Sequence, residues 1–436
     1  MPADVRADRP RRNTARVLRI VHEDGPLTRA ELTRRTGLNR STTLALVGEL
    51  VALGLVRESE SAGAPGVGRP SPVVRASPDV VAVAVTVEID AVTVALVGLD
   101  GSIRHRVTEH TDHRPTAAEA VRIVAGLLDG LRDAMRPLRT VGIGVSIPGT
   151  VRVEDGLVRY APHLGWRDEP FAAPLAAATG RPVRVANDAN LGARAEHLYG
   201  SGRGVRDLVY LNGGASGIGG GVISADRPLS GADGYAGELG HTFVADNGIR
   251  CHCGAFGCLE TEASRAALVA VTGVDADDLP ALAAALDAGG PEVDRVVDRQ
   301  VAALATGLRN AIHTVNPEVV VLGGFLGVLL GHVGDRIVTA VRAQSMAAMA
   351  DRVRIVPTAL GADVLLRGAA ELGFRDLLDD PQRADPAHAT TGTDRPGTAP
   401  DRPAPDRPAP DRPGTDRPGT APTPSDSDTH QEATTP

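Results

Sequence analysis

The sequence predicts an α/β protein in which a two-lobed body follows a small helical head and precedes an extended tail. Between residues 76 and 378, strand-rich segments give way to helix–strand alternation, and this pattern occurs twice, which is typical of two α/β lobes with a cleft between them. Capping residues and apolar spacing indicate three short helices in the head. From residue 379 onward the chain offers almost nothing apolar for a core.

Three residues of the head have side chains that commonly cap helix N-termini. They are Asn13, Thr28 in a Thr-Arg-Ala-Glu capping box, and Asn39, and they predict helices over 14–23, from 29 to a break at Gly37, and over 40–53. We therefore expect a flexible arm over residues 1–12 and a helical module that begins at residue 13.

The third predicted helix has one buried face and one polar end. Its inward positions follow the i, i+3, i+4, i+7 rule and are Thr43, Leu46, Val47 and Leu50. Arg40, Ser41 and Thr42 remain exposed at its N-terminal end. Short hydrogen-bond donors and a long cation suit the base edges and phosphates of a DNA major groove. A three-helix protein-interaction module with the same spacing is the alternative.

An extended wing is expected after Gly54, which makes residues 13–75 a winged helix-turn-helix. Near the tip of the wing, Arg69 stands between a glycine and a proline and is held out on a narrow turn. An arginine in this setting resembles those that enter the minor groove of DNA. A solvated arginine loop is the alternative for this segment.

The charge distribution favours a nucleic-acid partner for the head. The whole chain carries −8, but residues 1–75 hold thirteen arginines and eight acidic residues, a balance of +5 that leaves −13 for the remainder. A basic head on an acidic body is expected of a DNA-binding module that is steered electrostatically. The sequence has neither an apolar run long enough for a membrane span nor an N-terminal secretion signal, so a cytoplasmic location is expected.

The body is predicted from β-rich runs, turn signals and helical periodicity. The expected elements are strands over 80–87, 91–99 and 140–147, a helix over 117–135, a hairpin over 208–224 and a last helix over 362–377. The resulting lobes are 76–190 together with 360–378, and 191–359.

All three cysteines of the chain lie in one short segment, at Cys251, Cys253 and Cys258. With His241 upstream they offer a Cys₃His set for tetrahedral zinc, and His252 is a competing nitrogen ligand. Glycines between the cysteines allow the backbone to curl round an ion. The alternative is three buried free thiols, which are common in cytosolic proteins.

The segment from Glu238 to Glu260 resembles the signature of the ROK family (repressors, open reading frames and sugar kinases), which reads Glu-x-Gly-His followed by Cys-x-Cys-Gly-x-x-Gly-Cys-Leu-Glu. Every fixed position is present, and the resemblance extends over roughly residues 13–375. It implies an actin-like, ribonuclease-H-like fold for the body and a structural zinc ion. Together with the DNA-binding head, it indicates a transcriptional regulator similar to the N-acetylglucosamine and xylose repressors.

The resemblance also implies a sugar site. Asn187 and Asp188 match the family positions that bind a hydroxyl and act as the general base, and Glu238, His241 and Glu260 resemble the remaining hydroxyl ligands. Carboxylates and amides of this kind suit vicinal diols, because they accept and donate hydrogen bonds at short spacing. The alternatives are a helix cap for Asp188 and support of the zinc ligands for Glu238 and Glu260.

The nucleotide side departs from the kinases of the family. Their first hairpin carries Asp-x-Gly-Gly-Thr, whose glycines let the backbone approach ATP phosphates. Here the corresponding segment is Thr86-Val-Glu-Ile-Asp90, in which Glu88 and Asp90 would repel a triphosphate. Glycine-rich stretches at 213–221 and 321–324 remain, either as part of a phosphate site or as turns that the fold requires.

The tail, residues 379–436, repeats Asp-Arg-Pro at positions 394, 401, 406, 411 and 416. Proline blocks helices and sheet ladders, so a disordered, extended coil is expected. A ligand for a proline-reading module is the alternative.

We therefore expect a sugar-responsive transcriptional repressor whose partners are operator DNA and a sugar or sugar derivative. A homodimer or a dimer of dimers is expected, because one winged helix covers one half-site. No catalytic residue is expected, with Asp188 a vestigial base. His163 stands where the family more often has asparagine, which leaves the identity of the sugar open. The alternatives are an active ATP-dependent sugar kinase with a DNA-binding head and a non-catalytic docking module.

Overall fold

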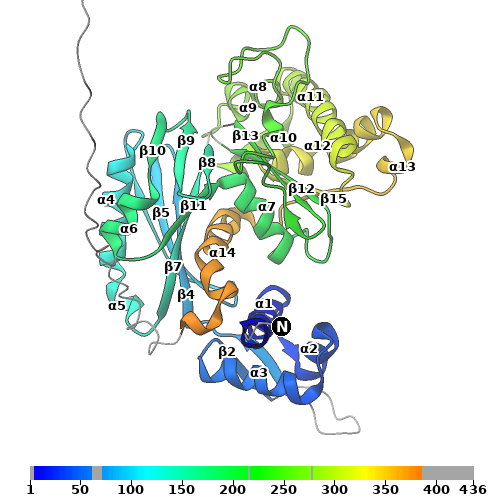
Figure 1. Cartoon of the computed structure of the whole chain (residues 1–436). Coiled ribbons are helices and arrows are strands. Elements are labelled where there is room, and N and C mark those ends of the chain that lie inside the picture. Colours follow the sequence, from blue (N-terminus) through cyan, green and yellow to red (C-terminus); the bar gives the residue numbers. More distant parts are fainter. Residues whose placement is uncertain (1–3, 61–70, 215–216, 276–277, 385–436) are drawn as a thin grey trace, which may run out of the picture. The chain divides into compact units, whose positions relative to one another are not determined.

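The computed structural model describes residues 4–60, 71–214, 217–275 and 278–384 (Figure 1). The strands within these ranges form two five-stranded and two three-stranded sheets. The α/β class and the N-terminal helix-turn-helix are therefore as predicted. Among the described helices, none combines the length and the apolar character that a membrane span needs.

The head has the elements of a winged helix-turn-helix. They are α1 (Asp4–Asp24), α2 (Arg29–Thr36), α3 (Arg40–Ala52) and a sheet of β1 (Leu27–Thr28), β3 (Val73–Ala76) and β2 (Val56–Ser59). The capping box of α2 is present, since the Thr28 hydroxyl accepts from the Glu31 amide at 3.2 Å and the Glu31 carboxylate accepts from the Thr28 amide at 2.7 Å. The Asn39 side chain caps α3 by accepting from the Thr42 amide at 2.8 Å.

Helix α1 differs from the prediction. It begins at Asp4 rather than at residue 14, so Asn13 lies inside the helix and the expected arm over residues 1–12 is helical from Asp4 onward. An interior asparagine costs less than about 0.7 kcal/mol relative to alanine, but Pro10 also lies inside α1 and costs about 3 kcal/mol, so helix propensity does not account for the extension. A good N-cap residue therefore did not mark the start of this helix.

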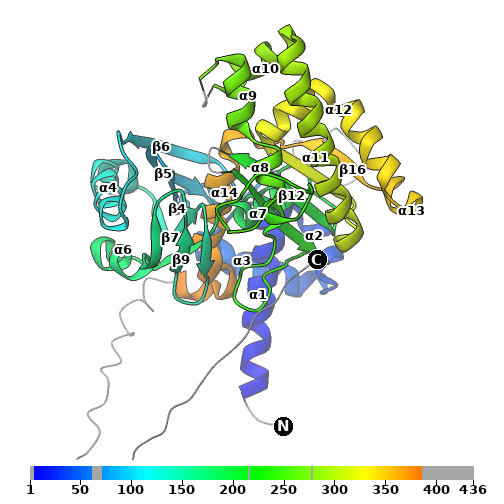
Figure 2. The same ribbon diagram turned by 90° about the horizontal axis from the view of Figure 1, so that it is seen from above.

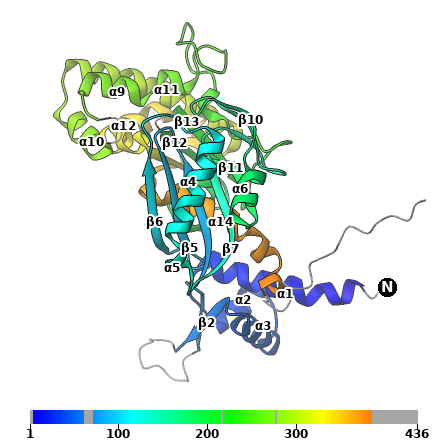
Figure 3. The ribbon, with the colours of Figure 1, turned by 90° about the vertical axis from the view of Figure 1, so that its left-hand side faces the viewer.

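The first five-stranded sheet carries most of its helices on one face. Its order is β11-β7-β4-β5-β6, with β6 and β11 at the two edges (Figure 3). The strands are β4 (Val80–Val87), β5 (Ala91–Gly98), β6 (Ile103–His110), β7 (Arg139–Ile147) and β11 (Val183–Asn187), and the covering helices are α4 (Ala117–Gly130), α5 (Arg132–Met135) and α6 (Ala172–Thr179). The helix expected over 117–135 is thus interrupted at Leu131, after Gly130. A small sheet of β8 (Thr150–Arg152), β9 (Leu157–Ala161) and β10 (Trp166–Pro170) adjoins it.

The second five-stranded sheet has the order β14-β13-β12-β15-β16. Its strands are β12 (Leu208–Gly214), β13 (Gly217–Ser224), β14 (Arg227–Pro228), β15 (Val319–Gly324) and β16 (Arg354–Pro357). The helices of this half are η1 (Leu239–His241), α8 (Leu259–Glu262), α9 (Arg265–Thr272), α10 (Leu279–Ala288), α11 (Pro291–Val315), α12 (Phe325–Gln344) and α13 (Ala347–Ala350). Helices α9 to α12 group together on the side away from the first sheet (Figure 2).

Two helices lie between the sheets, α7 (Asp188–Tyr199) and α14 (Val364–Asp379) (Figure 1). Two short 3₁₀ helices flank α14, namely η2 (Gly361–Asp363) before it and η3 (Pro381–Ala384) after it. Helix α14 packs on β4 and β7 of the first sheet, as predicted for the last helix, and α7 packs between α14 and β12–β13. The approach is so close that a Cβ on Gly144 of β7 would lie 1.8 Å from the Ala369 carbonyl oxygen of α14. Both helices are therefore held in direct backbone contact with their neighbours.

Candidate functional site

A cavity of about 330 Å³ lies where both five-stranded sheets, the small sheet and the cysteine-rich loop meet. Its lining residues are Pro148, Gly149, Thr150, Tyr160, Pro162, His163, Asn187, Asp188, Gly217, Ile218, Gly219, Glu238, His241, His252, Cys253 and Glu260. All five residues that the sequence indicated for a sugar are in this set. The fold thus brings together side chains from β11, α7, η1 and α8 that are far apart in the sequence.

Asn187 and Asp188 sit at the junction of β11 and α7. The Asn187 amide donates to the Gly149 carbonyl at 3.0 Å and its oxygen accepts from the Asn190 amide at 3.0 Å, so Asn187, rather than Asp188, is the N-cap of α7. Asp188 accepts from the Ala189 amide at 2.8 Å and is otherwise turned to the cavity. The helix-cap alternative for Asp188 is therefore wrong, because a neighbour performs that role.

The cavity is acidic. Burial raises the pKa of Asp188 to about 7, with the negative charges of Glu238 and Glu88 adding to the effect. Burial also raises the pKa of Glu238; His241, whose Nε2 lies 3.9 Å from its carboxylate, opposes this and Glu260 adds to it. A pKa near neutral pH is the range in which a general base works, and the deprotonated carboxylate is also a hydroxyl acceptor.

The cysteine-rich loop has the donor geometry of a tetrahedral zinc site. The sulfurs of Cys253 and Cys258 are 3.7 Å apart, and Cys251 Sγ lies 3.5 Å from His241 Nδ1. Zinc bonds of about 2.3 Å to sulfur and 2.0–2.1 Å to nitrogen set tetrahedral edges of about 3.8 Å for two sulfurs and about 3.6 Å for sulfur and nitrogen. These four donors lie within 4.8 Å of one another and therefore fit zinc.

A second donor set overlaps the first and comprises His241, Cys251, His252 and Glu260. His252 Nδ1 is 3.2 Å from the Glu260 carboxylate but 3.9 Å from Cys251 Sγ. The three-cysteine set suits zinc better, since thiolates are soft ligands and the distance between the Cys253 and Cys258 sulfurs matches a tetrahedral edge. His252 is then left to line the cavity.

Three imidazole rings form a row along the cavity, which the sequence alone did not indicate. The ring centroid of His252 is 5.2 Å from that of His163 and 5.1 Å from that of His241, in both cases edge to face. Nε2 of His163 is buried without a hydrogen-bond partner among the described residues. A buried polar atom without a partner is costly, so His163 is available to a ligand hydroxyl.

Several glycines of the stretches at 213–221 and 321–324 lie where a larger side chain would clash with its neighbours. A Cβ on Gly217 would lie 2.4 Å from the Glu260 carboxylate, and one on Gly221 would lie 2.6 Å from the Ala189 carbonyl oxygen. In the other stretch, a Cβ on Gly324 would lie 2.0 Å from the Gly213 carbonyl oxygen, and its φ of 58° is itself one that glycine favours. Close packing therefore accounts for the need for glycine at these three positions.

The hairpin that would face ATP phosphates is formed by β4 and β5, as predicted. Its turn is closed by the Glu88 amide, which donates to the Ala91 carbonyl at 2.8 Å. The Glu88 side chain is exposed, and its charge acts on Asp188. A carboxylate at this turn thus adds to the negative potential of the cavity mouth.

The predicted DNA-contacting residues of α3 lie at its exposed N-terminal end. Arg40 and Ser41 are exposed and Thr42 is half-buried, while the inward positions Thr43, Leu46, Val47 and Leu50 are buried. The Ser41 hydroxyl donates to Asn39 at 2.8 Å, which fixes its orientation at the helix start. Arg69 lies outside the described residues.

The fold and site define a class: a two-lobed α/β protein that carries an N-terminal winged helix and combines a polar cavity with a cysteine-rich loop. Residues 82–375 match the ROK family and residues 10–64 match the MarR family. The chain belongs to the ROK family.

Its relatives include both enzymes and regulators. A glucokinase of Thermotoga maritima is 32% identical over 302 residues, which cover 64% of this chain and 93% of that protein. A xylose repressor of Caldicellulosiruptor bescii is 27% identical over 397 residues, or 85% of this chain and 98% of the repressor. Among solved structures, a ROK family transcriptional regulator described as a homolog of the E. coli MLC protein has a TM-score of 0.71 at 25% identity and covers 85% of this chain and 97% of its own.

Proposed function

We propose that this chain is a sugar-responsive, DNA-binding transcriptional repressor whose zinc-stabilised body binds a sugar without phosphorylating it. The head would bind operator DNA as part of a dimer or a dimer of dimers, and the cavity would bind the effector. In the body, Asp188 and Glu238 would accept sugar hydroxyls, while Asn187 has one amide hydrogen left to donate.

The observation that supports this most is the joint presence of head and body in one chain. The xylose repressor and the MLC-like regulator each align with about 85% of the chain, whereas the glucokinase aligns with 64%. The head matches the MarR family over residues 10–64, and Arg40 and Ser41 are exposed there at the start of α3. An exposed cation and hydroxyl at that position suit a major groove.

The function can be tested with the full chain. We expect it to enrich specific duplexes from a random DNA library, and we expect D-xylose, D-glucose or N-acetylglucosamine to change the affinity for the enriched duplex by roughly 5–150-fold. Fluorescence anisotropy measures both. Failure to enrich any duplex, or an affinity that none of a wide panel of sugars alters, would contradict the proposal.

Arg40→Gln is expected to weaken binding of that duplex and to lower the slope of log affinity against log salt by about 1, because one phosphate contact is lost. Arg342→Gln, which removes an exposed arginine of α12, is the matched control and should change neither quantity. Equal effects of the two substitutions would exclude a specific role for the start of α3.

The effector is expected to be an unphosphorylated sugar. Three carboxylates line the cavity, those of Asp188, Glu238 and Glu260, and no arginine is among its described lining residues. The negative charge of a phosphate group would be repelled by these carboxylates. We therefore expect glucose 6-phosphate to bind at least about tenfold more weakly than glucose in isothermal titration calorimetry. 6-O-Methylglucose controls for the bulk of the substituent, and phosphate binding as tight as the parent sugar would contradict this prediction.

A second candidate is an active sugar kinase, which the placement of Asp188 and the similarity to a glucokinase favour. Glu88 would oppose it, because the resemblance to the kinases of the family aligns it with the phosphate-binding hairpin, where its carboxylate would repel ATP. An ATP-coupled assay with the same sugars separates the candidates. Turnover near 1 s⁻¹ or faster, about the lower end for ordinary enzymes, would favour the kinase.

A further inference from the structure

The last turn of α1 ends in a buried polar cluster that joins the head to the body. His22 is 2% exposed, its Nδ1 lies 2.6 Å from the Leu99 carbonyl oxygen, and its Nε2 lies 2.8 Å from the Glu371 carboxylate of α14. The Tyr199 hydroxyl, at the end of α7, lies 3.2 Å from His22 Nε2 and donates to Glu371. The head is thus attached through specific hydrogen bonds.

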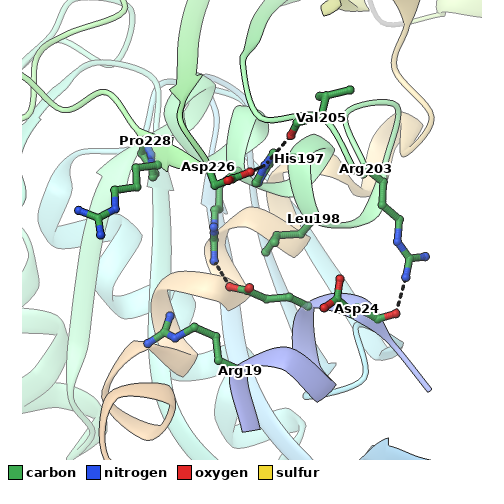
Figure 4. Close-up of a pocket in the computed structure, with 12 residues that line it drawn as sticks. Arg19, Asp24, His197, Leu198, Arg203, Val205, Asp226 and Pro228 are labelled. Carbon is green, nitrogen blue, oxygen red and sulfur yellow. Dashed lines mark hydrogen bonds and ion pairs between the residues drawn. The ribbon is translucent and has the colours of Figure 1, made fainter. Parts of the chain in front are cut away.

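Further contacts to α1 come from α7 and the turn that follows it. Arg194 donates to the Glu23 carboxylate at 2.8 Å and lies 3.9 Å from Glu371. Arg203 donates to the Asp24 carbonyl oxygen at 2.6 Å (Figure 4). The last three residues of α1 are therefore each bound by a side chain from α7 or from just beyond it.

The N-terminal end of α7 forms part of the wall of the sugar cavity. Asp188 is the first residue of α7, and its cap Asn187 also lines the cavity. A helix of twelve residues spans about 18 Å, so one rigid element reaches from the cavity to the head.

Helix α7 has little freedom to bend between these ends. A Cβ on Gly368 of α14 would lie 2.3 Å from the Leu191 carbonyl oxygen, and one on Gly192 would lie 2.4 Å from the Tyr210 ring of β12. Because α7 is packed closely against both α14 and β12, a displacement at Asp188 carries the whole helix with it. The movement would then appear at Arg194 and Tyr199.

The cluster at the head end favours discrete arrangements. Burial lowers the pKa of His22, but the charge and hydrogen bond of Glu371 outweigh it, so the pKa is raised overall. Burial raises the pKa of Glu371, yet His22 and Arg194 lower it to about 2. A buried ion pair is stable only while its geometry is maintained, so the junction is either formed or broken rather than gradually deformed.

We propose that α7 transmits the occupancy of the sugar cavity to the head, by way of Arg194 and Tyr199. This inference rests on the proposed function, and it adds the structural route by which sugar binding would affect DNA binding. When a sugar occupies the cavity, Asp188 at the start of α7 gains contacts that it lacks when the cavity is empty. These additional contacts favour one of the two arrangements, formed or broken, of the polar cluster around His22.

The test uses Arg194→Gln and Tyr199→Phe in the full chain, with Arg19→Gln as the control. Arg19 also joins α1 to the body, but its hydrogen bond at 2.8 Å is to Asp379 of α14 and not to a residue of α7. Anisotropy gives the affinity for an enriched duplex with and without the sugar that raises the melting temperature most among D-xylose, D-glucose and N-acetylglucosamine. Titration calorimetry gives the sugar affinity, and thermal unfolding verifies that each variant is folded.

We expect both α7 variants to bind the sugar within about threefold of wild type, while the sugar-induced change in duplex affinity falls from roughly 5–150-fold to below about threefold. Arg19→Gln should retain the wild-type change. Full coupling in both α7 variants, or an equal loss in Arg19→Gln, would overturn the route through α7. A wild-type chain that shows no sugar response would instead contradict the proposed function itself, and this inference with it.

Discussion

Cys258→Ser is expected to remove zinc from the protein and to lower sugar affinity by more than about 100-fold. Even substitutions of residues that merely support a metal ligand cost about 10–100-fold in metal affinity, and Cys258 is proposed as a ligand itself. Glu260, which lines the cavity, follows Cys258 by only two positions in the chain. Release of the loop would therefore displace Glu260 and His241 together.

Elemental analysis of the purified variant measures zinc per chain, and titration calorimetry measures sugar binding. His252→Ala is the matched comparison, because His252 belongs only to the alternative donor set and Cys258 only to the three-cysteine set. We expect His252→Ala to retain one zinc ion per chain. Zinc retained by Cys258→Ser and lost by His252→Ala would show that the alternative set is the ligand set.

Asp188→Asn is expected to lower sugar affinity by about 10–100-fold and to abolish most of its pH dependence. Hydrogen bonds to a charged group contribute about 1.5–3 kcal/mol, and asparagine has no charge. The pKa of Asp188 in the sugar-free protein is about 7, and sugar hydroxyls donate stronger hydrogen bonds to the deprotonated, charged form than to the protonated one. Binding therefore lowers this pKa, so wild-type affinity should be constant above about pH 8 and fall as the pH drops through 7.

Other ionisable side chains also line the cavity, namely Glu238, Glu260, His163, His241 and His252. The comparison of affinity–pH profiles from pH 5.5 to 8.5 between wild type and Asp188→Asn isolates the contribution of Asp188. A variant that keeps the wild-type profile would assign the pH dependence to the histidines or the other carboxylates.

Much of the fold could be predicted because its signals are local. The capping box at Thr28, the cap at Asn39 and the β-rich runs of β4 and β5 each depend on neighbours within a few positions, and each was found in its predicted place. The predicted start of α1, which also depended on a local signal, was wrong. The cap signal at Asn13 falls inside a helix that continues through Pro10 to Asp4, against the helix propensity of that proline.

The candidate site was partly accessible from the sequence, through the cysteine spacing and the family signature. What the sequence did not reveal depends on contacts between distant segments. His163 and His252 come into contact only when the small sheet meets the cysteine-rich loop. In the polar cluster that joins α1 to the body, Glu371 lies 349 positions from His22 in the sequence, and Tyr199 lies 177 positions from His22. No periodicity or cap in a single sequence reports such a pairing.

The central claim, that one chain couples a sugar cavity to a DNA-binding head, is tested most directly by measuring sugar affinity with and without DNA. Linkage requires that a duplex change the sugar dissociation constant by the same factor by which the sugar changes duplex affinity. We predict equal factors of at least about fivefold by calorimetry with the enriched duplex, and no change with a scrambled duplex of equal length. A sugar dissociation constant that is identical in the presence and absence of the bound duplex would contradict the account.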